Sequence, residues 1–381
     1  MRVLFWSLGF SPEIGGIEIL AGKFLPAMRQ RGHEYLVVTS RNNPTLPEQT
    51  IHEGIPIHRF PFWQSLANVD ELVVVRQQVA KLKRLFAPEL IHLNGLGRDS
   101  FFHLVTAGAH AAPLLITLHG EWVAQADALV GSALRSADWV AGCSDSVLKV
   151  GQSLAPDIIP RSCVIYNAVE EPATAPESLP VDTQRVLCLG RMSQEKGFDL
   201  ALAAFALLVK RFPRARLVFA GDGPTRRYLE QQATALGVAQ FVEFLGWVSR
   251  DRLPDLINTC AVVVIPSRQE SLPLVALEAG LMARPVVGSR VGGLPEIVLH
   301  QQSGLLVDKE DSAALAQAIV YLFEHPDSAA QMGQAARNRV QRKFNWEQHV
   351  DSYDQLYRKV VANGAGYRLR SRFDRFGTDG L

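Results

Sequence analysis

The sequence predicts an α/β protein with two consecutive doubly wound domains, and three observations support this fold class. Short apolar, β-branched runs alternate with amphipathic stretches of helical length, a pattern typical of a parallel sheet covered by helices on both faces. The chain has 381 residues, roughly the length of two domains. A polar, proline-rich stretch at residues 170–177 interrupts the alternation, which then begins again.

The first predicted domain comprises residues 1–170. Its expected strands are residues 3–6, 35–39, 90–93, 114–118, 139–141 and 163–165, and its expected helices include residues 17–31, 72–86 and 123–136. Residues 101–120 are uncharged, but histidines, Gly108 and Pro113 interrupt them. A buried helix followed by a strand explains this stretch better than a membrane span does.

The second predicted domain comprises residues 171–345. Its expected strands are residues 185–189, 216–220, 242–245, 261–265 and 285–288. Apolar positions spaced along one helical face predict a helix over residues 346–363. Residues 364–381 are expected to form a basic, flexible tail. Both domains are then Rossmann-like, and a ligand site is expected beyond the carboxyl ends of their strands, in a cleft that the two domains face.

The composition excludes several classes of protein. The formal charge is +1, so no global field favours nucleic acid. The four cysteines form no C-x-x-C pair, which favours reduced thiols over a zinc or disulfide site. The N-terminus runs directly into a strand rather than into the basic and apolar regions of a signal peptide. We therefore expect a cytoplasmic protein.

The strongest chemical signal is a pair of glutamates, Glu270 and Glu278, that follows the strand expected at residues 261–265. A carboxylate accepts two hydrogen bonds from neighbouring sugar hydroxyls, and the backbone of residues 272–275 would offer free N–H groups at a helix start. The alternative is a helix cap and a solvated helix residue. Glu278, however, falls among apolar residues, where a charge needs a partner.

Two cations after the strand at residues 185–189 form the second signal. Arg191 and Lys196 flank a short loop before a helix, as in a phosphate cradle, although two surface cations are the alternative explanation. The tight turn around Gly223 follows the next strand and belongs at the same sheet edge.

In the first domain, glycines and a histidine occupy the corresponding loops. Gly15 and Gly16 join the first strand to its helix and allow a close approach of the backbone to a ligand. His119 ends the strand at residues 114–118, although a single histidine is more often structural than catalytic.

Several motifs are absent from the sequence. No D-x-D occurs, which disfavours a metal bound between paired carboxylates and the diphosphate, and we expect no metal or other cofactor. No G-x-G-x-x-G fingerprint, Walker loop or G-x-S-x-G elbow occurs either. The missing dinucleotide fingerprint counts against a nicotinamide-dependent oxidoreductase.

Over about residues 1–360, these motifs occur in the order found in a known family, and the chain resembles the family-four retaining GT-B glycosyltransferases (glycosyl transferases group 1). The resemblance is specific in the second half and looser in the first, and it implies that the helix at residues 346–363 crosses back to the first domain. The motifs that support it are Gly15-Gly16-Ile17-Glu18, Arg31-Gly32-His33-Glu34, His119-Gly120, Gly190-Arg191, Glu195-Lys196-Gly197, Gly221-Asp222-Gly223-Pro224, Glu270 with Glu278, and Gly292-Gly293-Leu294-Pro295-Glu296.

The resemblance implies a role for each matching residue. Glu278 would bind the donor ribose, Glu270 the donor sugar, and Arg191 and Lys196 the diphosphate. Glu270, His119, Arg191 and Lys196 are the implied catalytic residues. The other residues of the implied donor site are Gly15, Gly16, Gly190, Gly223, Val248, Leu272, Pro273, Leu274, Val275 and Glu278. Pro273 stands where many members have glycine, and it removes one backbone donor.

The implied activity is retaining, metal-independent transfer of a sugar from a UDP- or GDP-sugar to a hydroxyl group of a carbohydrate or lipid-linked acceptor. Two alternatives remain open: a GT-B-like nucleotide-sugar epimerase and a non-catalytic sugar-binding subunit. The helix at residues 72–86 carries Lys81, Lys83 and Arg84 beside apolar residues, so peripheral contact with anionic lipid and a solvated helix face are both compatible with it.

Overall fold

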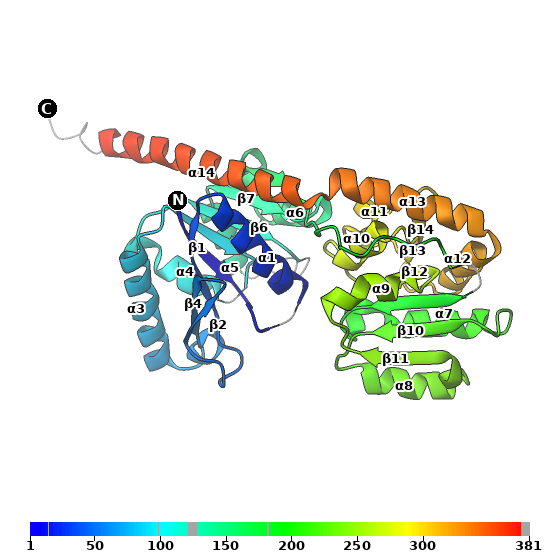
Figure 1. Cartoon of the computed structure of the whole chain (residues 1–381). Helices are drawn as coiled ribbons and strands as arrows, with labels where there is room; N and C mark the ends of the chain where they lie inside the picture. Colours follow the sequence, from blue (N-terminus) through cyan, green and yellow to red (C-terminus); the bar gives the residue numbers. More distant parts are fainter. Residues whose placement is uncertain (14, 98, 121–127, 181–182, 375–381) are drawn as a thin grey trace, which may run out of the picture. The chain divides into compact units, whose positions relative to one another are not determined.

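The structure is a computed structural model that describes residues 1–13, 15–97, 99–120, 128–180 and 183–374, with side chains described up to residue 364. The chain forms two compact units, coloured along the sequence in Figure 1. The N-terminal domain consists of Met1–Tyr166 together with the chain from Glu347 onward, and the C-terminal domain consists of Asn167–Trp346. Both domains have a mostly or wholly parallel sheet with helices packed against it.

Within the described residues, eight strands form the sheet of the N-terminal domain in the order β3-β4-β2-β1-β5-β6-β7-β8. All pairs are parallel except β3 with β4. The strands are β1 (Arg2–Ser7), β2 (Glu34–Ser40), β3 (Gln49–His52), β4 (Ile55–Phe60), β5 (Leu90–Asn94), β6 (Leu114–Leu118), β7 (Trp139–Gly142) and β8 (Ser162–Val164). The helices are α1 (Gly16–Gln30), α2 (Phe62–Ser65), α3 (Val69–Phe86), α4 (Ser100–Val105), α5 (Ala128–Ser136), α6 (Asp145–Leu154) and α14 (Trp346–Asp374).

The C-terminal domain has a wholly parallel sheet in the order β11-β10-β9-β12-β13-β14. Its strands are β9 (Arg185–Leu189), β10 (Arg216–Ala220), β11 (Val242–Gly246), β12 (Val262–Ile265), β13 (Val286–Ser289) and β14 (Gly304–Val307). Its helices are α7 (Phe198–Leu208), α8 (Arg226–Ala235), α9 (Leu253–Asn258), α10 (Leu274–Leu281), α11 (Leu294–Ile297), α12 (Ser312–Glu324) and α13 (Pro326–Lys343). Phe205 of α7, Phe219 of β10 and Leu315 of α12 belong to one buried apolar cluster. Burying each such side chain contributes about 1.5–3 kcal/mol.

Helix α3 shows how its sequence sets its ends and its buried face. The Asn68 side chain caps the first turn by accepting from the backbone N–H of Asp70 at 3.0 Å. The helix ends at Phe86 and is followed by its C-cap Ala87, which has a φ of 47°. Val75, Val79 and Lys83 are buried. The placement of Lys83 with Lys81 on a basic outer face was therefore wrong, because Lys83 lies on the apolar stripe that faces the domain core.

The buried Lys83 ammonium has acceptors. Its Nζ lies 3.3 Å from His103 Nδ1, 3.2 Å from the carbonyl oxygen of His103 and 3.4 Å from that of Thr106. Burial disfavours the charged form and lowers the pKa of Lys83 to about 7.

Helix α14 belongs to the core of the N-terminal domain although it follows the C-terminal domain in sequence. Tyr353 and Tyr357 are 3% and 0% exposed. The Tyr357 hydroxyl lies 2.7 Å from His92 Nδ1 on β5, and the Tyr353 hydroxyl lies 3.1 Å from Thr117 Oγ1 on β6. His92 Nε2 lies 2.8 Å from the same threonine oxygen, so this network joins the helix to two central strands.

The end of α14 differs from the expected flexible tail at residues 364–381. The helix continues to Asp374. After Gly366 the sequence contains no proline or glycine up to that residue, and its arginine and leucine residues have high helix propensity. Residues 375–381 lie outside the described part, as do residues 123–127 of the helix expected at 123–136.

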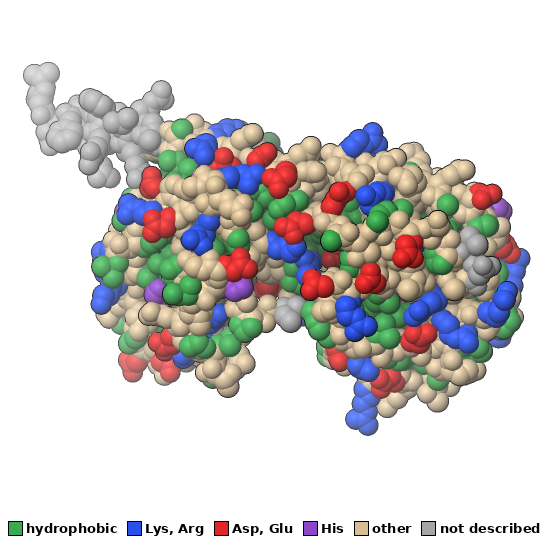
Figure 2. All heavy atoms as spheres, viewed as in Figure 1, with side chains coloured by type: hydrophobic (Ala, Val, Ile, Leu, Met, Phe, Trp, Pro, Cys, Tyr) green, Lys and Arg blue, Asp and Glu red, His purple; other side chains and the backbone are tan. Residues whose placement is uncertain are grey.

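Charged side chains are mixed on the surface. Figure 2 shows basic and acidic side chains interspersed over the visible face of each domain, in agreement with a formal net charge of +1. Among the helices that the structure describes, none combines the length and apolar character needed to cross a bilayer.

Candidate functional site

Each sheet has a topological switch point, where the strand order reverses direction and adjacent loops leave the carboxyl edge on opposite faces. In the C-terminal domain it lies between β9 and β12, and in the N-terminal domain between β1 and β5. Open α/β sheets bind ligands at such points. The loop after β9 carries Arg191 and Lys196, and the loop after β12 carries Glu270, so the fold places these predicted residues at the switch point.

Lys196 and Glu270 form the centre of this site. Lys196 Nζ lies 2.7 Å from Glu270 Oε1, which also accepts a hydrogen bond from the Ser267 hydroxyl at 2.7 Å. The glutamate side chain is 6% exposed and the lysine side chain 30%. A nearly buried carboxylate is thus neutralised by a cation that still reaches solvent, and the loops after two neighbouring strands meet at this pair.

Glu278 lies within α10 and has the partner that its apolar neighbours predicted. Arg250, in the loop after β11, donates to Glu278 Oε1 at 3.1 Å. The sequence did not single out Arg250, because the two residues are separated by 28 positions. Pro273 precedes the first turn of α10, and Leu274 and Val275 lie in that turn. Leu272 and Pro273 are buried, and Leu274 and Val275 are partly buried.

The glycine loops after β9 and β10 pack directly on one another. Gly190 N donates to the carbonyl of Ala220 at 3.0 Å, and Met192 N donates to that of Asp222 at 2.9 Å. A Cβ on Gly223 would lie 2.4 Å from the Met192 carbonyl oxygen, so only glycine fits there. Arg191 projects from this loop with its side chain 72% exposed, and its Nη2 forms an ion pair with Glu195 Oε1 at 3.5 Å. Val248 follows β11 and is partly buried.

In the N-terminal domain, the predicted residues also follow strand ends. Gly15 precedes α1 and Gly16 is its first residue. His119 follows β6, but its side chain points into the protein: it is 6% exposed, and its Nε2 lies 2.8 Å from Asn94 Oδ1 at the end of β5. Burial lowers the pKa of His119 to about 3, so the imidazole is neutral at physiological pH. The sequence did not identify Asn94, although its position at a strand end was a usable signal.

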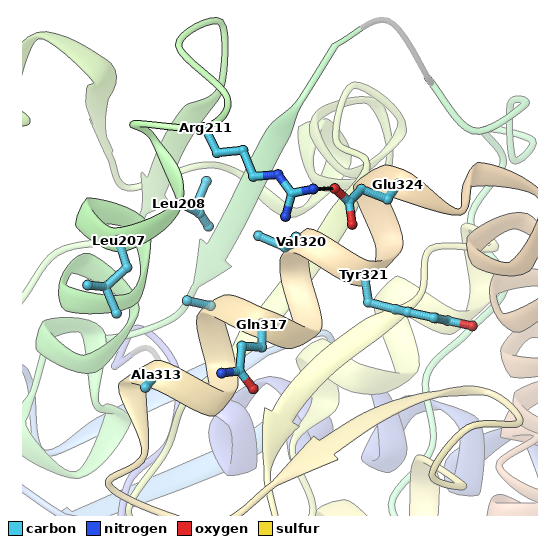
Figure 3. A pocket seen from close by; sticks show the side chains of 9 residues that line it. Leu207, Leu208, Arg211, Ala313, Gln317, Val320, Tyr321 and Glu324 are labelled. Carbon is cyan, nitrogen blue, oxygen red and sulfur yellow. Dashed lines mark ion pairs between the residues drawn. The ribbon is translucent and has the colours of Figure 1, made fainter.

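Two observations elsewhere in the described chain bear on the choice of site. No group of three or more His, Cys, Asp or Glu residues has metal-binding geometry within the described residues. A surface hollow of about 370 Å³ lies between α7 and α12, with Leu208, Val320 and Tyr321 in its lining and the Arg211–Glu324 ion pair at one end (Figure 3). Its lining contains none of the predicted site residues among those described.

Comparisons with known sequences agree with this arrangement. Residues 15–161 match the model of the Glycosyl transferase 4-like domain, and residues 170–339 match that of Glycosyl transferases group 1. A glycogen synthase of Mycobacterium tuberculosis is 26% identical over 395 residues, covering 94% of each chain. A D-inositol 3-phosphate glycosyltransferase of Saccharomonospora viridis is 33% identical over 257 residues, covering 65% of this chain and 59% of that protein.

Solved structures share the fold. Sucrose-phosphate synthase of Thermosynechococcus elongatus has a TM-score of 0.83 at 23% identity, covering 95% of this chain and 99% of that one. HepE of Anabaena, solved in complex with UDP, has a TM-score of 0.79 at 23% identity, covering 94% and 100%. Two doubly wound domains of this kind form the GT-B fold, and the family models and named relatives support a glycosyltransferase. The chain belongs to the glycosyl transferases group 1.

Proposed function

We propose that the enzyme transfers a sugar from a UDP- or GDP-sugar to a hydroxyl acceptor, with retention of configuration at the anomeric carbon and without a metal cofactor. The observation that carries the proposal is the contact of 2.7 Å between Lys196 Nζ and Glu270 Oε1 at the switch point of the C-terminal sheet. A donor of this class combines an anionic diphosphate with sugar hydroxyls, which match a cation and a carboxylate held side by side.

In this proposal, each charged group has one task. Lys196 and Arg191 bind the diphosphate, Glu270 accepts hydrogen bonds from the donor sugar, and Glu278 accepts them from the ribose. Backbone N–H groups from Leu272, Leu274 and Val275 supply further donors around the sugar. The roles proposed for Gly15, Gly16, His119, Gly190, Gly223 and Val248 rest on the resemblance and remain predictions.

The proposed reaction is a same-face substitution. The bond between the anomeric carbon and the phosphate oxygen breaks, the bond to the acceptor oxygen forms, and the acceptor proton passes to the leaving phosphate oxygen. Negative charge develops on the diphosphate as it leaves. Arg191 and Lys196 stabilise this charge in place of a metal ion, and Lys196, which Glu270 already holds, needs little reorganisation during the reaction.

For the acceptor we propose a growing polysaccharide or a glycolipid, and for the location the cytoplasm with peripheral membrane contact. The glycogen synthase relative supports the first choice. On α3, Lys81 and Arg84 are exposed close to exposed Leu85, which supports attraction to anionic lipid. Vesicles containing anionic lipid should sediment with the protein at low salt and release it at high salt. Absence of binding at low salt would exclude the membrane contact.

The function is tested by nucleotide binding. We expect UDP or GDP, in the presence of EDTA, to raise the unfolding temperature, since a ligand at 100 times its dissociation constant adds about 2.7 kcal/mol to the free energy of unfolding. Glu278→Ala should weaken this shift. Glu243→Ala, which removes another arginine-paired glutamate of the same domain, should leave it unchanged.

The remaining outcomes separate the alternatives. A shift with NAD alone, or with none of UDP, GDP and ADP, would contradict the donor site. Conversion of the sugar nucleotide into an isomer without any acceptor would identify an epimerase instead of a transferase.

A further inference from the structure

Arg268 connects the two loops of the candidate site, although no motif in the sequence singled it out. It lies two residues before Glu270 in the loop after β12. Its backbone N–H donates to the carbonyl of Glu195 at 2.8 Å, and its Nη1 donates to the carbonyl of Gln194 at 2.8 Å. Both acceptors immediately precede Lys196, so Arg268 binds the loop that carries the lysine with its backbone and its side chain.

Two carboxylates from different parts of the domain bind the guanidinium group of Arg268. Asp199, in the first turn of α7, accepts through both oxygens at 2.8 and 2.7 Å. Glu310, between β14 and α12, accepts through both oxygens at 2.6 and 3.1 Å. Bidentate pairs of this kind restrict an arginine far more than a single contact does. These contacts raise the pKa of Arg268, and its side chain is 23% exposed.

Glu310 binds Arg268 although its backbone has a conformation that is unfavourable for a residue with a side chain. Glu310 has a φ of 65°, in the left-handed region that residues with a side chain adopt rarely. Glycine at this position would relieve the backbone but remove the carboxylate that binds Arg268.

The same two loops also meet through their backbones. Gly197, next to Lys196, has a φ of 65°, and a Cβ on it would lie 2.1 Å from the Pro266 carbonyl oxygen. The lysine loop therefore rests directly on the start of the glutamate loop. Arg268 connects the same two loops and is itself bound by Asp199 of α7 and by Glu310, which precedes α12.

We propose that Arg268 is a positioning residue that sets Lys196 against Glu270 and so prepares the cradle for the donor diphosphate. The proposal rests on the function proposed above for that pair. A lysine has a flexible four-carbon stem, and its ammonium group reaches a productive place only if its backbone is fixed. Arg268 fixes that backbone without touching the donor itself, while Asp199 and Glu310 neutralise its charge.

A double-mutant cycle tests the proposal, with UDP as the probe and its dissociation constant measured by calorimetry. Lys196→Ala should weaken UDP binding about tenfold, and Arg268→Ala should weaken it by a similar factor. Because both changes remove the same contact, the double variant should bind only about twofold more weakly than Lys196→Ala alone. Arg268→Lys should not restore binding, since an ammonium group cannot pair with two carboxylates bidentately.

Arg185→Ala is the matched control. Arg185 begins β9 in the same domain, pairs with Glu243 and has a side chain that is 26% exposed, similar to that of Arg268. Its removal should leave UDP affinity unchanged. Wild-type affinity in Arg268→Ala, or additive losses in the double variant, would overturn the positioning role. Wild-type affinity in Lys196→Ala would overturn the phosphate role of Lys196, and with it both proposals.

Glu310→Gly separates positioning from folding even if Arg268→Ala does not fold. The glycine removes one carboxylate and relieves the left-handed backbone. We expect an unfolding temperature that is unchanged or raised, together with UDP binding about threefold weaker. Unchanged UDP affinity, or an affinity loss accompanied by a lower unfolding temperature, would contradict the proposal.

Discussion

The two domains share a fold plan but differ in the polar groups on and just beyond their central strands. In the C-terminal domain, Lys196 and Glu270 are charged and the lysine reaches solvent. In the N-terminal domain, His92 and His119 are buried and uncharged, since burial lowers the pKa of each to about 3. The first arrangement is the one proposed to bind an anionic ligand, whereas His92 of the second joins the sheet to α14. Charged groups beyond the strands of the C-terminal domain thus have a proposed role in recognition, and the neutral His92 within the N-terminal sheet contributes to cohesion.

Among variants that test this comparison, Lys196→Ala should have the largest effect. It removes a charged group from the loop after β9 in the C-terminal domain. We expect the rate at which the bound donor is cleaved to give a nucleoside diphosphate to fall by about 10²–10³-fold, because such a contact stabilises charge that develops in the transition state. Lys210→Ala, which removes an exposed lysine of the same domain, should leave this rate unchanged. Full turnover by the Lys196 variant would remove the basis for distinguishing the two domains.

A smaller effect should follow from Lys83→Met in the N-terminal domain. The pKa of Lys83 is about 7 in the folded protein, below its unfolded value, so the folded state binds fewer protons above pH 7. The free energy of unfolding should then rise with pH from about 7 to 10, by up to about 1.4 kcal/mol per unit from this group. Its destabilising effect is fully present below pH 7.

Chemical denaturation between pH 7 and 9.5 checks this prediction. Lys83→Met should be more stable than the wild type at pH 7, and the difference should shrink as the pH rises. Lys81→Met, in the same helix but exposed, is the control and should follow the wild type. A stability difference that does not change with pH would show that Lys83 is not neutral in the folded domain.

The smallest effect should come from Tyr357→Phe. This variant tests only the contact between α14 and the sheet of the N-terminal domain. The variant leaves His92 Nδ1 without the hydroxyl that lies 2.7 Å away. A buried polar atom that loses its partner costs about 1–3 kcal/mol of stability. Denaturant unfolding should register this loss while the affinity for UDP remains within about twofold. Tyr228→Phe, on exposed α8, should change neither property, and weaker UDP binding by the Tyr357 variant would blur the division between the domains.

Most buried parallel strands were predictable from the sequence, but β4 and β14, which are parallel and largely buried, were not among the expected strands, and exposed or long-range features were not predictable either. Strand β12 is a continuous apolar run and β9 is apolar after its first residue, because both faces of a parallel sheet are covered. The short strand β3 has exposed and partly buried residues and pairs antiparallel at the sheet edge, so it lacks that signal. Lys83 differs from Lys81 only in its position around the helix, and the apolar stripe could have distinguished them.

The site was predictable to the extent that its chemistry is local. Glu270 and Lys196 stand out because each follows an apolar strand. Glu278 required a partner, but the identity of Arg250 depends on which two loops the sheet brings together. The role of Arg268 depends on contacts among three separate segments of the chain. A motif within one segment therefore could not have revealed it.

The position of α14 in the sequence bears on how the protein is made. The core of the N-terminal domain needs Tyr353 and Tyr357, yet the whole C-terminal domain is encoded before them. At about 5–20 residues per second, a ribosome needs on the order of ten seconds or more to translate the intervening segment. The domain that leaves the ribosome first is thus completed last, and in the meantime β5 and β6 lack the two tyrosines that α14 later packs against them.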